Sequence, residues 1–380
     1  MKVLLLDAAF SARPIYDALV GAGHEVWVAG NREADPLARK AGDHWLRLDY
    51  SDVEVVRQEV QSLGIERLIP GCTDVSLMTC VAIGMTPDLV DSAEVNAQLS
   101  DKARFRAMCE RLDLPSPRAI PLADFPRQGR YICKPVDAFS GRGITIFDGE
   151  DSQALERAVS AAESSSASGQ YLLETCVEGQ LYSLSAFLVS QKIAYDVCVI
   201  EGSSANPYAV DTSHVVHDLP PAALAELRQG LERMSMDLSL RDGLLHTQFI
   251  LAGEDPYIVE VTRRCPGDLY SLLIEYSTGF PYAAAYAAAF LGPIAIPPAG
   301  EQRHILRHSV ASTQGELYQA LAFASPVPIK ALFPLMPVGE TLLPAQRNRA
   351  AVLFADYDSP AALAEAYALY MARAAYDLSG

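Results

Sequence analysis

Residues 246–264 read HTQFILAGEDPYIVEVTRR, and this stretch predicts a β-hairpin whose turn is Gly253-Glu254-Asp255. Two runs of alternating apolar and polar residues flank a turn of the Gly/Asp type that commonly joins paired strands. If the strands are symmetric about Glu254, opposed residues have Cβ atoms about 5 Å apart. The predicted opposed pairs are Gln248 with Glu260, His246 with Thr262, and Ile250 with Ile258.

The two faces of this hairpin differ in chemistry. One face is predicted to be buried core and carries Leu245, Thr247, Phe249, Leu251, Tyr257, Val259 and Val261. The other face gathers an acid, an amide, a histidine and a threonine. Oxygen ligands of this kind suit Mg²⁺ that is bound jointly with phosphates. The alternative is a solvated sheet face on which Glu260 is merely exposed, and the hairpin taken alone favours that alternative.

A second stretch, residues 134–143 with the sequence KPVDAFSGRG, places a lysine at a strand end before a glycine-containing loop. Glycine allows backbone N–H groups to approach phosphate oxygens, and Lys134 and Arg142 add positive charge. The loop lacks the GK[ST] ending of a Walker loop. Considered by itself, a turn of this composition is more often a plain hairpin turn.

The first 70 residues alternate strands and helices, with strands expected at Val3–Leu6, Glu25–Ala29 and Arg67–Pro70. Repeated β-α-β units with short links predict a parallel, doubly wound sheet. The turn after the first strand contains no GxGxxG, which argues against a nicotinamide dinucleotide site. The loop that includes Thr73 and Asp74 follows a strand end, where open α/β sheets bind ligands. Both residues are therefore candidate substrate contacts.

The rest of the chain predicts an α+β arrangement. A small β-rich unit with one helix precedes two hairpins and a long helix. The expected elements are strands at 131–134, 143–147 and 171–174, hairpins at 182–200 and 246–262, a helix at 221–238, strands near 303–311 and 350–354, and a final helix opened by Ser359-Pro360. We expect that final helix to pack internally.

Composition excludes several classes of protein. The chain has 380 residues and a net charge of −17, so nucleic acid is an unexpected partner. No apolar run is long enough to span a bilayer, and Asp7 interrupts any signal-peptide core. The seven cysteines form no CxxC pair, which predicts reduced thiols and a cytoplasmic location.

The order of five features resembles that of the ATP-grasp superfamily, which includes biotin carboxylase, carbamoyl-phosphate synthetase and D-alanine–D-alanine ligase. These features are Lys102 at a helix start, Lys134 before the glycine loop, the run LETCVEG at 173–179, Gln248, and the run EVTRR at 260–264. The resemblance covers most of the chain and weakens toward the C-terminus. It implies a Rossmann-like N-terminal domain at 1–98, an ATP-grasp core at 99–292 with a lid at about 121–178, and a small C-terminal domain at 293–380.

The resemblance implies ATP and Mg²⁺ as cofactors and assigns residues to them. Lys102 and Lys134 match the lysines that contact the phosphates, and Arg264 matches the arginine beside the reacting phosphate. Lys134 and Arg264 are thus the expected catalytic groups. The remaining nucleotide and metal positions are the mobile loop Ser140, Gly141, Arg142 and Gly143, the adenine hinge Glu174 and Val177, and the metal-binding Glu260.

Three positions depart from the pattern of the superfamily. The metal-binding acid on the first hairpin strand is Gln248, the asparagine after the second acid is Thr262, and the acid that holds the ribose is Leu181. An uncharged Gln248 is expected to weaken one of two metal positions. Glu178 is a substitute candidate at the ribose.

The implied function is that of an ATP-dependent carboxylate–amine ligase that works through an acyl phosphate, with an amino acid as a substrate. Candidate substrate contacts are Thr73, Asp74, His214, Arg263, Arg264 and Asp268, with Arg303 and Arg307 as weaker ones. The expected partners are small molecules, and neither a membrane nor nucleic acid is expected. Homodimers are common for this architecture. Two alternatives stay open: a purine-biosynthesis-like enzyme that acts on a ribonucleotide, and an ATP-binding protein with degenerate catalysis.

Overall fold

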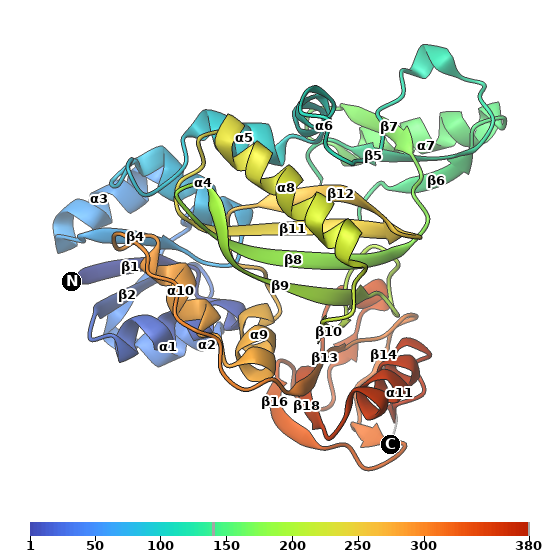
Figure 1. The fold of residues 1–380 in the computed structure, drawn as a ribbon. Helices are drawn as coiled ribbons and strands as arrows, with labels where there is room; N and C mark the ends of the chain where they lie inside the picture. Colours follow the sequence, from blue (N-terminus) through green and yellow to red (C-terminus); the bar gives the residue numbers. More distant parts are fainter. Residues whose placement is uncertain (139–140, 379–380) are drawn as a thin grey trace.

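The computed structural model describes residues 1–138 and 141–378 (Figure 1). Its N-terminal part is a parallel sheet with the strand order β3-β2-β1-β4, which confirms the predicted doubly wound arrangement. The strands are β1 (Lys2–Leu6), β2 (Glu25–Gly30), β3 (Trp45–Arg47) and β4 (Arg67–Pro70), and the helices are α1 (Arg13–Gly21), α2 (Pro36–Ala41), α3 (Val53–Leu63) and α4 (Asp74–Ile83). Strand β3 was not predicted.

Burial explains why the first strand is so apolar. Residues Val3 to Leu6 have no exposed surface, because helices cover both faces of the parallel sheet. The carboxylate of Asp52 accepts hydrogen bonds from the first backbone N–H groups of α3, and Gly64 ends that helix in a left-handed conformation. The carboxyl ends of β1 and β4 therefore open onto one edge of the sheet.

A small antiparallel sheet with the order β6-β5-β7 stands apart from the other sheets and carries one helix (Figure 1, upper right). Two helices connect it to the N-terminal part. These elements are α5 (Ala93–Ser100), α6 (Lys102–Arg111), β5 (Arg130–Pro135), β6 (Thr145–Asp148), α7 (Ser152–Ser165) and β7 (Tyr171–Thr175). The apolar face of the sheet packs on Ala158 and Ala162 of α7.

The largest sheet has eight strands in the order β12-β11-β8-β9-β10-β13-β18-β16. Its strands are β8 (Gln180–Val189), β9 (Lys192–Gly202), β10 (Thr212–Val216), β11 (Gly243–Ala252), β12 (Asp255–Thr262), β13 (His304–Val310), β16 (Ile329–Pro334) and β18 (Ala351–Tyr357), and α8 (Pro221–Asp237) packs on it. The first hairpin turns at Ser190 and Gln191, both with positive φ. As the strand order shows, the C-terminal strands β13, β18 and β16 continue the sheet that contains the second hairpin.

The register of the second hairpin confirms part of the prediction. Gln248 faces Glu260 and His246 faces Thr262, as expected. The prediction for Ile250 is wrong, because an irregularity between Gln248 and Phe249 shifts the register so that Ile250 faces Tyr257. The shift also moves Ile258 into the core, where it is fully buried. The polar pair Gln248 and Glu260 lies just before this shift.

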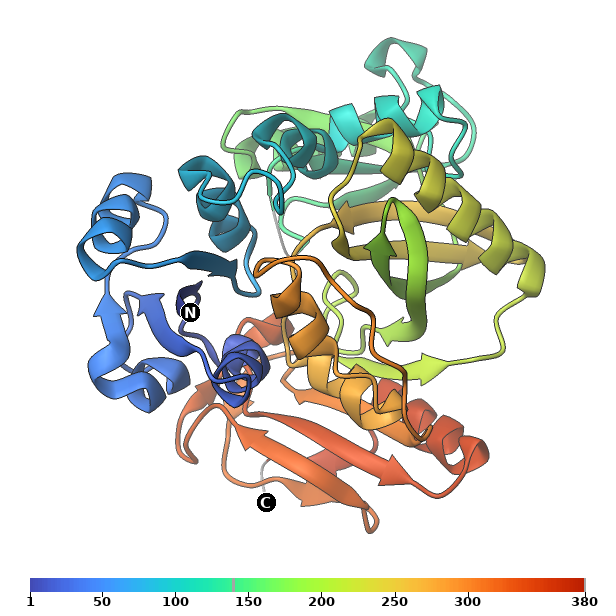
Figure 2. The same cartoon turned by 60° about the vertical axis from the view of Figure 1, so that its left-hand side comes forward.

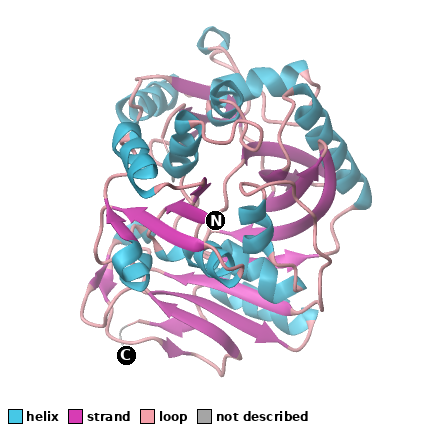
Figure 3. Cartoon of the chain, turned by 90° about the vertical axis from the view of Figure 1, so that its left-hand side faces the viewer, coloured by secondary structure: helices cyan, strands magenta, loops and turns pink. Residues whose placement is uncertain are grey.

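The C-terminal segment completes the large sheet and covers it. Helix α11 (Pro360–Met371) buries Leu363, Ala366 and Tyr370 against β13 and β18, which confirms internal packing. In Figure 3 the long strands of this segment run side by side below the rest of the molecule. Short strands complete the segment: β14 (Glu316–Leu317), β15 (Ala322–Phe323), β17 (Thr341–Leu342) and β19 (Tyr376–Asp377).

Two helices join the N-terminal part to the large sheet. Helices α9 (Tyr270–Thr278) and α10 (Tyr282–Ala288), orange in Figure 2, lie between the blue N-terminal part and the sheet. One apolar cluster runs from α1 through these helices to β8 and β13. The Tyr286 hydroxyl donates to the Pro70 carbonyl at 3.1 Å and so ties α10 to the end of β4. In the described part of the chain, no helix is long and apolar enough to cross a membrane.

Candidate functional site

A buried cluster of charges lies where the small sheet meets α6. The carboxylate of Glu174 on β7 is fully buried and forms two ion pairs. Its Oε1 lies 2.6 Å from Arg106 Nε, and its Oε2 lies 2.5 Å from Lys134 Nζ. Arg106 also donates to the Val259 carbonyl on β12 at 2.8 Å. The cluster therefore fixes Lys134 at the end of β5 and connects the small sheet to the second hairpin.

Lys102 lies in the same electrostatic environment, at the first residue of α6. Its ammonium group donates to the carbonyls of Val136 and Ala138, each at 3.1 Å, in the loop that follows Lys134. Burial lowers the pKa of Lys102, and the positive charge of Lys134 acts in the same direction. The negative charge of Glu260 opposes this shift. The charges of Lys134 and Glu260 thus both act on Lys102.

The glycine loop lies beside these lysines. Gly141 has φ +74°, and a Cβ atom there would stand 2.3 Å from Tyr208 Cβ. Gly143 has φ +72°, and a Cβ atom there would stand 2.5 Å from Ser165 Cβ. Both positions therefore require glycine. Arg142 is exposed, and Ser140 lies outside the described residues.

The predicted adenine hinge follows β7 directly. Val177 is half-buried. Glu178 is exposed and paired with Arg130. Leu181 faces Ile250 across the β8–β11 pair, so that position offers no polar group. Glu174 itself is committed to Arg106 and Lys134, and this ion-pair role was not anticipated.

Beside Gln248 the structure places an acid that the sequence analysis missed. Glu201 on β9 is 5% exposed, and its Oε2 accepts a hydrogen bond from Gln248 Nε2 at 2.7 Å. Burial raises the pKa of Glu201, whereas hydrogen bonds from Ser183 and Gln248 and the charge of Arg307 lower it. The available signal was an acid within the apolar run VCVIEG at 197–202. It could not be assigned to a site without the strand order.

Glu201 belongs to a row of polar side chains that crosses the large sheet. Ser213 on β10 faces Glu201 and also faces Arg307 on β13. Arg307 is 3% exposed and donates to the Ser213 hydroxyl at 2.8 Å and to the Asp268 carbonyl at 3.1 Å. The row thus leads from Glu260 and Gln248 to the loop that contains Asp268.

The loop after β4 and the start of α4 lie close to Arg264, just after β12. Arg264 forms a bidentate ion pair with Asp74, with Nε–Oδ1 at 2.7 Å and Nη2–Oδ2 at 3.1 Å. The Thr73 hydroxyl caps α4 by accepting the Ser76 N–H at 3.1 Å. A Cβ atom on Gly71 would stand 2.1 Å from Asp7 Cβ, so the ends of β1 and β4 meet only because residue 71 is glycine.

The remaining predicted substrate contacts divide into two groups. Asp268 joins the site: Arg349 Nη1 lies 2.6 Å from its Oδ1, and its own N–H donates to the Ser11 hydroxyl at 3.1 Å. Arg263 is buried against Asp91 at 2.6 Å and is therefore committed to holding the chain between α4 and α5. Arg303 lies at the surface, paired with Asp356.

His214 and His246 lie on two strands of the large sheet, β10 and β11. His214 on β10 packs against Tyr367 of α11, with ring centroids 5.1 Å apart, whereas the neighbouring Ser213 points to Arg307. The structure thus does not bring His214 to the polar row. His246 is buried and its Nδ1 lies 2.8 Å from the Ser185 hydroxyl. Burial, followed by the charge of Arg264, lowers the pKa of His246 to about 3, so this imidazole is neutral.

The oxygen-rich pair Gln248 and Glu260 fits a divalent cation that is shared with phosphates. Across residues 1–138 and 141–378, no three His, Cys, Asp or Glu side chains gather closely enough to hold a metal ion. A carboxylate and an amide oxygen supply two ligands, and Mg²⁺ commonly takes its others from phosphate and water. Glu260 is exposed and Gln248 is half-buried, so both are accessible.

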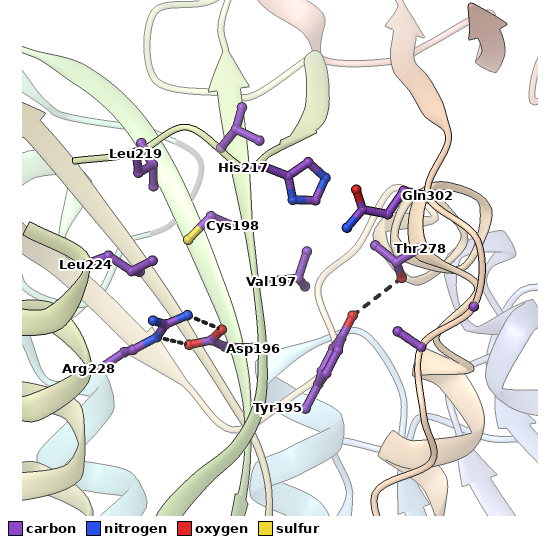
Figure 4. A pocket seen from close by; sticks show the side chains of 13 residues that line it. Tyr195, Asp196, Val197, Cys198, His217, Leu219, Leu224, Arg228, Thr278 and Gln302 are labelled. Carbon is purple, nitrogen blue, oxygen red and sulfur yellow. Dashed lines mark hydrogen bonds and ion pairs between the residues drawn. The ribbon is translucent and has the colours of Figure 1, made fainter. Parts of the chain in front are cut away.

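A separate cavity of about 260 Å³ lies between β9, the start of α8 and the loop before β13 (Figure 4). An ion pair between Arg228 and Asp196 borders it on one side, with distances of 2.5 and 2.7 Å. A hydrogen bond from Tyr195 to Thr278 borders it on the other side. None of the predicted site residues lines it. The cavity therefore lies apart from the residues that the motif order predicted.

Comparison with known proteins finds relatives both by sequence and by structure. No known family model matches the chain. Phosphoribosylamine–glycine ligase from Pyrococcus horikoshii is 24% identical over 293 residues, which cover 70% of this chain and 66% of that protein. The matched region is thus slightly less than two thirds of the length of this relative.

Solved structures match the entire chain. An L-amino acid ligase from Bacillus licheniformis has a TM-score of 0.78 at 15% identity and is covered to 99%. A biotin carboxylase from Campylobacter jejuni, described as a β,γ-ATP complex, has a TM-score of 0.76 at 12% identity and is covered to 92%. These matches extend over 100% of this chain. The chain therefore has the ATP-grasp fold, as the order of its motifs predicted.

Proposed function

We propose that this chain, whose fold is that of the ATP-grasp enzymes, is an ATP-dependent carboxylate–amine ligase. One observation carries the proposal: the Lys102 ammonium group donates to the carbonyls of Val136 and Ala138, in the glycine loop that directly follows Lys134. The charge of Glu260, from a third part of the chain, acts on Lys102 as well. Two cations suit phosphate oxygens, and one accessible carboxylate suits the cation that accompanies them. The chain as a whole has a net charge of −17, so this local concentration of positive charge stands out as a specific feature of the site.

In this proposal the triphosphate lies along Lys102 and Lys134 beneath the loop with Gly141 and Gly143. The adenine occupies the hinge near Val177. Glu174 holds the ammonium group of Lys134 in place from the buried side, because its Oε2 lies 2.5 Å from Nζ. The small sheet with α7, within the expected lid at about 121–178, would cover the nucleotide and exclude water.

The chemistry follows from charge. A carboxylate is a poor electrophile, and transfer of the γ-phosphate of ATP to a carboxylate oxygen gives an acyl phosphate and ADP. An amine then attacks the acyl carbon, phosphate departs, and the amine gives up a proton. Mg²⁺ held by Gln248 and Glu260 would supply charge neutralisation at the phosphates. Arg264, held by Asp74, lies where it can stabilise the negative charge that develops during transfer.

The substrate carboxylate and amine would bind at the opposite end of the polar row. Arg349 and Asp268 lie there, beside the buried Arg307. Guanidinium groups recognise carboxylates, and carboxylates recognise ammonium groups, so this mixed charge suits an amino acid. Similarity to the L-amino acid ligase supports this choice at the level of the fold. In the same proposal, Arg263 and His214 support the structure and do not contact substrate.

The experiment measures ADP release with a coupled assay against pools of amino acids, with and without Mg²⁺. The expected result is Mg²⁺-dependent ADP release with at least one pool. A dipeptide or other amide should be detected by mass spectrometry in that pool. If ATP binds and no pool releases ADP, the ligase proposal for amino acids is wrong.

A second candidate is favoured by the match to phosphoribosylamine–glycine ligase. In that case the amine would be a phosphorylated ribosylamine and the carboxylate would be glycine. A ribose phosphate would need cations near the end of β1, where Ser11 contacts the loop of Asp268. ADP release with glycine that requires a ribosylamine phosphate would select this candidate over the first.

The proposal also places the reaction in a reducing compartment. The seven cysteines are all free thiols and six of them are buried, which suits the cytoplasm. The proposed partners are small molecules, and a homodimer is the arrangement to test by light scattering. Limited proteolysis would test the proposed domain limits 1–98, 99–292 and 293–380, because flexible boundaries are cleaved first.

A further inference from the structure

Glu201 is a buried carboxylate in the centre of the large sheet that contacts a proposed ligand of the metal. It lies on β9, is 5% exposed, and accepts a hydrogen bond from Gln248 Nε2 at 2.7 Å. Burying a carboxylate is unfavourable unless it has partners. Its partners are Gln248 and Ser183, with Arg307 as the nearby positive charge. Because burying the Glu201 carboxylate is unfavourable, we expect this residue to have a role, and its contact with Gln248 suggests which role.

The covalent geometry of an amide explains what this contact does. A glutamine side chain is planar, with a donor –NH₂ and an acceptor oxygen that point in directions about 120° apart. Strand β11 lies between β8, on the side of Glu201, and β12, which carries Glu260 directly opposite Gln248. When Nε2 donates toward Glu201, Oε1 is directed away from Glu201, toward the side of Glu260. The amide then presents an oxygen beside the carboxylate of Glu260.

We propose that Glu201 is a positioning residue that orients Gln248 so that its carbonyl oxygen, together with the carboxylate of Glu260, binds the Mg²⁺ that accompanies ATP. This inference rests on the proposed function. If the amide of Gln248 were reversed, its –NH₂ group would face the cation, and an amide –NH₂ group cannot bind a cation. Hydrogen bonds from groups around a metal site commonly set the orientation of its ligands. Glu201 thereby makes an uncharged side chain an effective ligand at this position.

Glu201 is itself held in place by its surroundings. Ser183 donates to it, and the Ser183 hydroxyl also lies 2.8 Å from the hydroxyl of Tyr270. Ser213 faces it on β10 and binds Arg307. The Ser183 hydroxyl favours an acceptor on its side of residue 201. If residue 201 were glutamine, its oxygen would remain with Ser183 and its –NH₂ would face Gln248, which would turn the carbonyl of Gln248 away from Glu260.

The test is a double-mutant cycle of Glu201→Gln and Gln248→Glu, read out as Mn²⁺ affinity by electron paramagnetic resonance. The probe is Mn²⁺ with adenylyl imidodiphosphate, an ATP analogue that is not hydrolysed, so the measurement does not depend on turnover. Glu201→Gln should weaken Mn²⁺ binding by about tenfold or more. Affinity for the analogue in EDTA should stay within about twofold, because the lysine contacts are unchanged.

The second half of the cycle separates orientation from charge. A carboxylate at 248 presents an oxygen in either orientation, so in the Gln248→Glu background the change Glu201→Gln should not weaken Mn²⁺ binding. Equal weakening in both backgrounds would mean that Glu201 acts through its charge, and the inference would then be wrong. Unchanged Mn²⁺ affinity of Glu201→Gln in the otherwise native chain would also overturn it.

A matched control is Glu275→Gln. Glu275 lies on α9, is largely buried, accepts a hydrogen bond from the Ala283 N–H at 2.8 Å, and lies outside the polar row. This variant should keep Mn²⁺ affinity within about twofold. Failure of the ligase proposal is a different result: the native chain would bind Mn²⁺ and the analogue normally and yet release no ADP with any substrate pool.

Discussion

Arg264 and Asp74 are 190 residues apart in sequence and form a bidentate ion pair, with Nε–Oδ1 at 2.7 Å and Nη2–Oδ2 at 3.1 Å. The pair joins the first residue of α4, just after β4, to the second residue after β12. It is partly exposed, with 22% of the Arg264 side chain and 40% of the Asp74 side chain accessible. The N-terminal sheet therefore positions a proposed catalytic group of the large sheet.

We expect Asp74→Asn to lower kcat by about tenfold or more, because a slight displacement of Arg264 weakens its contact with the transferring phosphate. Affinity for ATP should change by less than about threefold, since Lys102 and Lys134 are untouched. Stability should fall by only about 0.5–1 kcal/mol, as for other partly exposed ion pairs. Steady-state kinetics and urea unfolding measure these quantities.

Asp196→Asn is the matched control for that change. Asp196 forms a bidentate ion pair with Arg228 beside the separate cavity. Its loss should cost a similar amount of stability and leave kcat unchanged within about twofold. If both variants lose activity equally, the Arg264–Asp74 pair has no special part in the reaction.

Glu260→Gln should lower kcat by at least about a hundredfold and leave the fold intact. Glu260 is exposed and faces only Gln248 across the hairpin, so its change should alter the free energy of unfolding by less than about 0.5 kcal/mol. Coupled ADP release and thermal unfolding measure these effects. Glu254→Gln, in the turn of the same hairpin, is the control and should retain activity. Full activity of Glu260→Gln would show that the metal site is misplaced.

Arg106→Met should destabilise the chain by about 3–5 kcal/mol. The change removes one of the two cations that compensate Glu174, whose carboxylate is fully buried. Denaturant unfolding measures the loss. Arg104→Met, which breaks an exposed pair with Glu94 and a long contact with Gln98, should cost less than about 0.5 kcal/mol. A loss below about 1 kcal/mol for Arg106→Met would contradict the structural role given to this cluster.

The stability of the chain should fall as the pH falls below 6.5, partly because of His308. Burial lowers the pKa of His308 to about 3 from 6.5, so below pH 6.5 the unfolded chain takes up a proton that the folded chain does not. This contribution is fully present above pH 6.5 and is lost toward pH 3, at about 1.4 kcal/mol per pH unit.

His308→Gln should therefore reduce the steepness of stability against pH between 6.5 and 5. His246 behaves in the same way and maintains a remaining slope. Urea midpoints at several pH values give both curves. The variant will be less stable at pH 7, since His308 contacts Thr212 and Tyr376. The prediction is tested only by the slope of the free energy of unfolding against pH. Parallel curves would contradict the prediction.

Local pattern was sufficient for much of the fold. The parallel N-terminal sheet and the pair Gln248–Glu260 followed from the alternation of residue types and from turn composition. Beyond the irregularity after Gln248 the pairing of Ile250 was wrong, because a shift of one residue in one strand leaves no mark in an alternating apolar run. Strand β3, only three residues long, was missed because it is too short to show a period.

The predicted nucleotide residues illustrate the same division. Lys102, Lys134 and Glu174 were chosen from motif order, and the structure brings them together. Arg106 was not chosen, since an arginine in an amphipathic helix gives no indication that it will be buried against Glu174. Glu201 was not chosen either, because only the strand order β11-β8-β9 brings it to Gln248.

Sequence by itself therefore determined the type of most long elements, though not of helices α4 and α9, because strand and helix periodicity and turn chemistry act between residues close along the chain. The ATP-grasp fold followed from the resemblance that the order of the motifs carries. Only the tertiary structure decided which charges meet: Arg264 with Asp74, Arg263 with Asp91, and Glu201 with Gln248. These contacts join residues far apart in sequence, and their energies depend on burial and distance, which a linear pattern does not contain.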